Sequence, residues 1–322
     1  MLKRLLKPLL ALVALALLIA GTVLLVAWRS PPYYVVSKPS AASANILPFK
    51  EYPKVSDHPR PYVVAAPGYV VFGATHTRDP KSPQLTVLEE HWRALRPTVA
   101  LVEGRLGFLF PGLMDAVEKL GEGGRVNALA KKDGIPVYNW DLPKETLARE
   151  LKTLFSAEQI ALSQILSPYF SQLRFGRPAS PESVIEGYLH RAANVGQQDA
   201  FKSAADVDRV WKKHFPEGPD WRDVSDERPL PGFLAEMMNA TNDLRNRQLV
   251  SAIEELRAKG ERVFVITGSS HAVCVQPALG SDVGTRPPPT ERTSPAPEPP
   301  HTPAPPPGPR APQSIPATEA AQ

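Results

Sequence analysis

The sequence predicts an α/β fold in which a mostly parallel β-sheet is flanked by helices. Two observations predict it. Four short runs are apolar throughout, as strands buried on both faces are, and segments with helical apolar spacing lie between them. The strand runs occupy residues 69–72, 98–102, 136–140 and 263–266.

The helices are predicted from apolar spacing. In residues 83–95, Leu85, Leu88 and Trp92 fall on one face. Two short helices are expected between the second and third strands, and a long block follows the third strand. The block has breaks where Gly and Pro gather, and we expect it to be an insertion that caps the sheet. These ranges are 113–120, 126–132 and, for the helical insertion, 144–256, with breaks near 176–178 and 216–231.

The N-terminal residues 1–30 are predicted to be a membrane anchor or signal segment. Lys3, Arg4 and Lys7 precede an uncharged apolar stretch, residues 8–28, whose length matches the hydrocarbon core of a bilayer. The positive-inside rule then places the folded domain outside the cytoplasm. The predicted location is the inner (plasma) membrane, single-pass, with an extracytoplasmic or periplasmic domain. Cleavage as a signal peptide would instead give a secreted protein.

The remaining chain divides by composition. Residues 31–62 are rich in Pro, Ser and Ala without a sustained period, and we expect a linker. Residues 63–284 are expected to form the α/β domain. Residues 285–322 hold 14 of the 37 prolines, so a disordered tail is expected. This tail could span a cell-wall layer, dock a partner, or be inert.

Charge and cysteine content exclude some classes of protein. The net charge of +4 is mild, and no run of Lys and Arg with interleaved aromatics is present, so nucleic acid is not an expected partner. Cys274 is the only cysteine, which excludes an internal disulfide and a cysteine-based metal site. We interpret it as a buried small residue.

Polar residues with catalytic potential follow all four predicted strands. His76 lies after the first, Glu103 after the second, Asp141 after the third and His271 after the last. Ligands of parallel sheets bind beyond the carboxyl ends of the strands. These four residues could therefore hold a divalent metal (Mn, Co or Zn), or the two imidazoles could act as a general acid and base.

A structural interpretation of the same residues stays open. A single His after a strand usually packs or caps a helix, and Glu103 could cap the helix after its strand. However, two GxxH sequences, Gly73 to His76 and Gly268 to His271, stand at equivalent corners far apart in the chain. This repetition favours a functional pair.

Three strings resemble the erythromycin esterase/ChaN-like superfamily, closest to its TraB, GumN and TIKI branch. They are VVFGATHTRDP, RPTVALVEGR and LRNRQLVSAIEELRAKGERVFVITGSSHAV, and the resemblance spans residues 69–278. The superfamily has two GxxH motifs, a Glu after the second strand, and an Arg, often followed by Asn, on the helix before the last motif. The matching positions are Gly73, His76, Glu103, Arg245, Asn246, Gly268 and His271. Asp141 stands where the family places another acidic residue.

The resemblance implies a hydrolytic or binding site at these positions. His76, Glu103, Arg245 and His271 would be catalytic, and Gly73, Asn246 and Gly268 would contact a cofactor. TIKI-like members are metal-dependent peptidases, and TraB-like members suppress peptide pheromones. Erythromycin esterase-like members hydrolyse a lactone with a His base, and ChaN-like members bind haem. Two departures are Leu244, where a Glu commonly stands, and a weak final strand at residues 279–286.

The predicted function is therefore an extracytoplasmic hydrolase, metal-assisted, that acts on a peptide or a small ester or amide. In a metal-free form of this reaction His76 acts directly as the base and Arg245 stabilises an oxyanion. Two functions without catalysis stay open. One is a haem- or peptide-binding envelope protein that uses the same residues, and the other is a structural envelope protein in which the Pro-rich tail matters.

Overall fold

The structure is a computed structural model that describes residues 18, 21, 27–173 and 176–280. Nearly all of the predicted anchor at residues 8–28 and the Pro-rich tail lie outside the described residues. Among the helices that are described, none has the length and apolar character needed to cross a bilayer.

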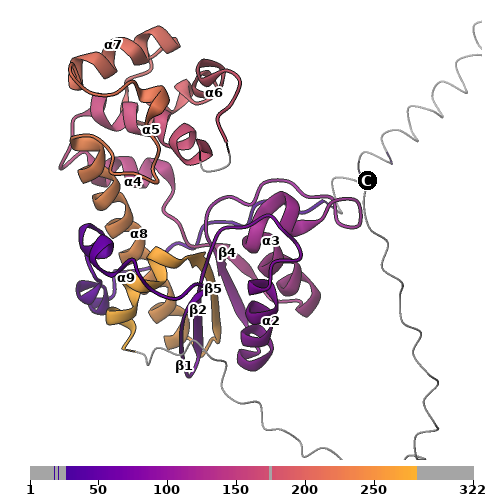
Figure 1. The fold of residues 1–322 in the computed structure, drawn as a ribbon. Helices are drawn as coiled ribbons and strands as arrows, with labels where there is room; N and C mark the ends of the chain where they lie inside the picture. Colours follow the sequence, from indigo (N-terminus) through magenta and orange to yellow (C-terminus); the bar gives the residue numbers. More distant parts are fainter. Residues whose placement is uncertain (1–17, 19–20, 22–26, 174–175, 281–322) are drawn as a thin grey trace, which may run out of the picture. The chain divides into compact units, whose positions relative to one another are not determined.

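A mostly parallel sheet flanked by helices forms the centre of the fold, as predicted, with five strands rather than the four that were expected (Figure 1). The strand order is β1-β2-β5-β3-β4. β2 pairs with β5, β5 with β3 and β3 with β4, all in parallel. The bounds are β1 Tyr62–Ala66, β2 Tyr69–Ala74, β3 Val99–Val102, β4 Val137–Asn139 and β5 Val263–Gly268.

Helices cover both faces of the sheet, which explains why β2, β3 and β5 are apolar throughout. One face packs against α2 (Gln84–Leu95) and α3 (Ala116–Asp133) through Leu88, Trp92 and Val126. The other packs against α8 (Phe233–Ala258) and α9 (Ser269–Leu279). Figure 1 shows these two pairs of helices on opposite sides of the strands.

The helical insertion builds an apolar core of its own. α8 joins this core to the sheet: Leu234 and Met237 are buried in the insertion, whereas Leu249 and Ile253 are buried against the strands. The other elements are α4 Lys144–Leu151, α5 Ala157–Gln172, α6 Pro181–Glu186, η4 Leu189–Val195, α7 Ala204–His214 and η5 Trp221–Asp223. The predicted break near 176–178 falls between α5 and α6, and the break at 216–231 falls between α7 and α8 and contains only the short η5.

Residues 31–62 differ from the expected linker, because they pack on the α/β domain. Two 3₁₀ helices form here, η1 (Ala41–Asn45) and η2 (Phe49–Val55). Tyr34 and Ile46 are buried in the core beside α8 and α9. β1, which pairs antiparallel with β2, was not predicted either. This strand lies at the edge of the sheet, and its first residue is the last residue of the predicted linker.

α3 contains the two short helices predicted after the second strand. Gly121 interrupts the helix with φ of 63° and ψ of −153°. Only glycine adopts this backbone conformation without strain. The interruption redirects the chain at Glu122, which becomes important at the functional site.

Candidate functional site

The parallel register brings the predicted residues to one edge of the sheet. Ala74 pairs with Gly268 in the β2–β5 ladder, and Val102 faces both Ile266 of β5 and Asn139 of β4. His76, Glu103, Asp141 and His271 each follow one of these strand ends within three residues. The predicted convergence on the carboxyl edge is therefore confirmed.

Arg245 of α8 joins these residues into one network. Its Nε donates to Asp141 Oδ1 at 2.6 Å, and its Nη2 donates to Glu103 Oε1 at 2.7 Å. Nη1 donates to Asn242 Oδ1 at 3.1 Å. Burial would lower the pKa of Arg245, but the carboxylates of Asp141 and Glu103 raise it above its ordinary value. The guanidinium is therefore a permanent cation at the centre of the site.

Glu103 is held as an anion. Burial is the largest single effect and would raise its pKa, but the charge and hydrogen bond of Arg245, together with the neighbouring imidazoles, outweigh burial and hold the pKa well below its usual range. Its second oxygen, Oε2, accepts hydrogen bonds from Thr267 Oγ1 at 2.9 Å and from the backbone N–H of Gly268 at 2.7 Å. Gly268 precedes α9, so the carboxylate also lies at the positive end of that helix.

His271 is a neutral imidazole with a defined tautomer. Arg245 Nη1 lies 2.9 Å from its Nε2. Because a guanidinium can only donate, Nε2 must be the acceptor. Nδ1 therefore carries the proton and donates to Asn246 Oδ1 at 2.7 Å. Burial, followed by the charge of Arg245, lowers the pKa of His271 to about 3.

Two aromatic rings close off His271 from solvent. Trp140 meets its ring edge-on, with centroids 5.3 Å apart, and Phe49 of η2 lies 6.1 Å away. The side chain is only 5% exposed. Both ring nitrogens are also occupied by Arg245 and Asn246, so His271 is a buried member of the network rather than a base that could reach a substrate.

His76 lies in more open surroundings than His271. Its side chain is 48% exposed, and it lines a pocket of about 190 Å³ together with Glu103 and Glu122. The pocket wall also contains Leu106, Leu120, Gly123, Ile266 and Thr267. A Cβ added to Gly268 would lie 3.1 Å from His76 Nε2 and 3.7 Å from Glu103 Oε2. The imidazole and the carboxylate thus face the same small space.

Glu122 is a site residue that sequence reasoning missed. It is 5% exposed, accepts a hydrogen bond from the backbone N–H of Thr77, and its Oε2 lies 3.7 Å from His76 Nδ1. The signal that could have found it is the string Gly121-Glu122-Gly123-Gly124. A Cβ on Gly124 would lie 2.1 Å from Ala116 O, so the interrupted helix requires glycine there.

Three of the four predicted metal ligands hydrogen bond to Arg245 in this arrangement. Glu103 and Asp141 direct carboxylate oxygens at Arg245, and Nε2 of His271 accepts from the same guanidinium. A cation already occupies the position that these three lone-pair donors share. Within the described ranges no group of three or more His, Cys, Asp or Glu is placed to hold a metal ion.

The three residues expected to contact a cofactor have partners within the fold. Asn246 accepts from His271, and Gly268 donates to Glu103. Gly73 allows α9 to approach β2, since a Cβ there would lie 2.6 Å from the Ala272 Cβ. Cys274 is buried, and burial raises the pKa of its thiol to about 12, which agrees with its interpretation as a small core residue.

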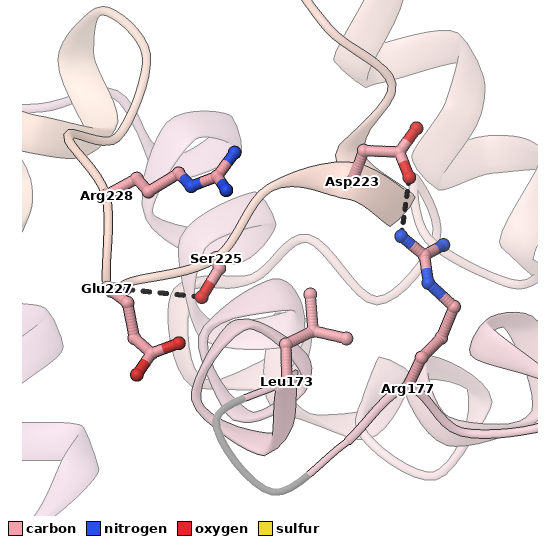
Figure 2. A pocket seen from close by; sticks show the side chains of 6 residues that line it. All are labelled: Leu173, Arg177, Asp223, Ser225, Glu227 and Arg228. Carbon is pink, nitrogen blue, oxygen red and sulfur yellow. Dashed lines mark hydrogen bonds and ion pairs between the residues drawn. The ribbon is translucent and has the colours of Figure 1, made fainter.

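A larger hollow of about 380 Å³ lies in the helical insertion (Figure 2). Its charged groups are exposed, and two of them form an ion pair in which Arg177 Nη2 donates to Asp223 Oδ1 at 2.6 Å. The backbone N–H of Glu227 donates to Ser225 Oγ at 3.3 Å. It contains none of the predicted site residues, so the smaller pocket at His76 is the candidate functional site despite its size.

Comparison of the chain with family models, with curated proteins and with solved structures gave no match. The resemblance to the erythromycin esterase/ChaN-like superfamily therefore rests on the two GxxH motifs and the residues that accompany them.

Proposed function

We propose that this protein is a membrane-anchored, extracytoplasmic hydrolase that cleaves a small ester or amide bond, with His76 as the general base. One observation carries the proposal. Of the two imidazoles in the GxxH motifs, only that of His76 lines the pocket, and it does so beside two carboxylates, Glu103 and Glu122.

The proposed reaction begins with a water molecule in the pocket. His76 accepts a proton from this water, whose oxygen then attacks the substrate carbonyl. The imidazolium that forms is stabilised by the anion of Glu103, and it later returns the proton to the leaving group. Arg245 holds Glu103 in place and ionised, so it acts through Glu103 rather than on the substrate.

The proposed reaction uses no metal; what supports this is that Arg245 hydrogen bonds to one carboxylate oxygen each of Glu103 and Asp141 and to Nε2 of His271. The site also favours a small substrate group over haem. The pocket volume of about 190 Å³ is below the roughly 300 Å³ at which pockets for drug-sized ligands begin.

The test is turnover by the full chain, purified in detergent, against a panel of aryl esters, lactones and short peptides. We expect H76A to lower kcat/KM by about 10²- to 10⁴-fold, the usual contribution of a general base. The exposed His190 provides a matched control, and H190A should leave the rate unchanged. Treatment with a chelator should also leave it unchanged.

Two results would contradict the proposal. One is full activity in H76A, and the other is no turnover of any member of the panel by the wild type. Loss of activity on chelation, restored by Mn²⁺, Co²⁺ or Zn²⁺, would replace it with the metal-assisted hydrolase predicted from the sequence.

A further inference from the structure

The loop that follows Glu103 exposes large apolar side chains. Between β3 and α3, Phe108 is 52% exposed, Leu113 80% and Met114 37%. In the part of the chain that the structure describes, seven large apolar residues are exposed, and three of them belong to this loop. A cluster of this kind marks a contact surface more often than single exposed residues do.

The same loop is bound to the residues where the apolar N-terminal segment ends. Trp28 donates its backbone N–H to Leu109 O at 2.8 Å, and Leu109 donates back to Trp28 O at 3.2 Å. Gly107 N–H donates to Ser30 Oγ at 2.8 Å. Residues 8–28 contain no charged side chain, so the position of Trp28 fixes where a membrane-spanning segment would leave the bilayer.

The residues beside this junction have the chemistry of a membrane interface. Trp is enriched at the level of the lipid headgroups, where its ring is half in apolar surroundings. Arg29 follows it in the chain, and Arg105 is exposed in the loop. Cationic side chains at this level attract anionic headgroups.

We propose that Phe108, Leu113 and Met114 form a membrane-contact surface that inserts into the interfacial region of the bilayer. The occupant is the lipid of the leaflet from which residues 8–28 emerge. This inference rests on the membrane anchoring in the proposed function. The backbone pairing of Leu109 with Trp28 holds the loop at the leaflet, and burial of the three apolar side chains stabilises that contact.

The surface lies close in sequence to the pocket. Leu106, two residues before Phe108, forms part of the pocket wall and is itself buried. A loop fixed on the membrane therefore fixes one wall of the pocket beside the leaflet.

The test places a fluorophore on the surface and on a matched control. Full-length L113C and L154C are labelled with the environment-sensitive dye NBD and reconstituted in vesicles of phosphatidylcholine and phosphatidylglycerol. Leu154 is comparably exposed, at 65%, but belongs to the helical insertion. Cys274 is buried, so the wild type should take up little dye and serves as the blank.

We expect the emission of L113C to shift to shorter wavelength and to be quenched severalfold by lipids that carry a spin label, with neither change in L154C. Equal, unquenched emission from both positions would overturn the inference. A blue shift in L113C without quenching by lipid would also overturn it, because a second protein chain would then cover the loop.

Flotation with the vesicles separates this inference from the proposed function. If the chain floats but L113C is not quenched, only the contact surface fails. If the chain does not float, membrane anchoring fails, and the contact surface fails with it. Loss of His76-dependent turnover affects neither measurement.

Discussion

The two GxxH motifs both lie at the carboxyl edge of the sheet, at the ends of the neighbouring strands β2 and β5, yet their histidines have opposite surroundings. His76 is half exposed in a pocket between two carboxylates. His271 is buried between Trp140 and Phe49 with both nitrogens hydrogen bonded. A repeated motif therefore does not imply a repeated role. In the proposed function one imidazole exchanges protons with a substrate, whereas the other accepts a hydrogen bond from the guanidinium of Arg245.

Among changes to the buried network around His271, removal of Arg245 should lower the stability of the fold most. R245M leaves the carboxylates of Glu103 and Asp141 without their cation. We expect a loss of roughly 3 kcal/mol in the free energy of unfolding, at the lower end for buried pairs because the side chains keep some solvent contact. Chemical denaturation measures it. R245K keeps the positive charge but loses the several N–H donors of the guanidinium. Its free energy of unfolding should therefore lie between those of R245M and the wild type.

Removal of His271 should have a smaller effect of the same kind. H271A takes one partner from Arg245 and one from Asn246, and it leaves space beside Trp140. The expected loss is about 1–3 kcal/mol in the free energy of unfolding. H271N should lose less, because its amide can still donate to Asn246. If H271A instead retains stability but lowers kcat as strongly as H76A, the division of roles between the two histidines is wrong.

The pH dependence of stability should sharpen the comparison further. The folded-state pKa of His271, about 3, lies below its ordinary value of 6.5, so the unfolded chain binds the proton first as the pH falls. The stabilisation by neutral His271 is complete above pH 6.5 and declines below it, by at most about 1.4 kcal/mol per pH unit. Denaturation between pH 6.5 and 4.5 should show this slope in the wild type and a weaker slope in H271N.

Substitution of Glu122, which lies beside the exposed His76, should have a smaller effect that is confined to kcat. In E122Q the amide oxygen can still accept from Thr77 N–H, but the negative charge beside His76 Nδ1 is lost. We expect kcat to fall by about tenfold, the rate equivalent of 1.4 kcal/mol, with KM and thermal stability close to wild type. E122D should recover part of kcat. Equal losses in stability and in KM would indicate that Glu122 only supports the fold.

The sequence predicted the parts of this molecule that depend on local patterns. Runs such as Val263 to Ile266 are apolar because both faces of the strand are covered, so a parallel sheet could be predicted. Its carboxyl edge then brings Glu103 and His271 together by register alone. Arg245 and Asn246 came from the resemblance to a family, since spacing on a long helix does not reveal which side chain faces the strand ends.

The parts that were not predicted depend on contacts between distant segments. Phe49 buries His271 from a stretch whose Pro-rich composition indicated a linker, and its backbone N–H donates to Asp243 Oδ1 at 2.7 Å. Glu122 falls between the two short helices predicted at residues 113–120 and 126–132, where no pattern in the sequence indicated a functional residue. Fold-wide burial, rather than residue type, also decides which imidazole is exposed, so the sequence alone treated His76 and His271 as equals.

The packed segment before the first strand has a practical consequence for shortened forms of the protein. Ser40 N–H donates to Ser251 Oγ and Leu47 N–H donates to Cys274 O, so this segment forms part of the wall over α8 and α9. A fragment that starts at residue 63 would lose that wall and uncover the imidazole of His271. A fragment that starts at residue 27 would keep this wall and also the backbone pairing of Trp28 with Leu109.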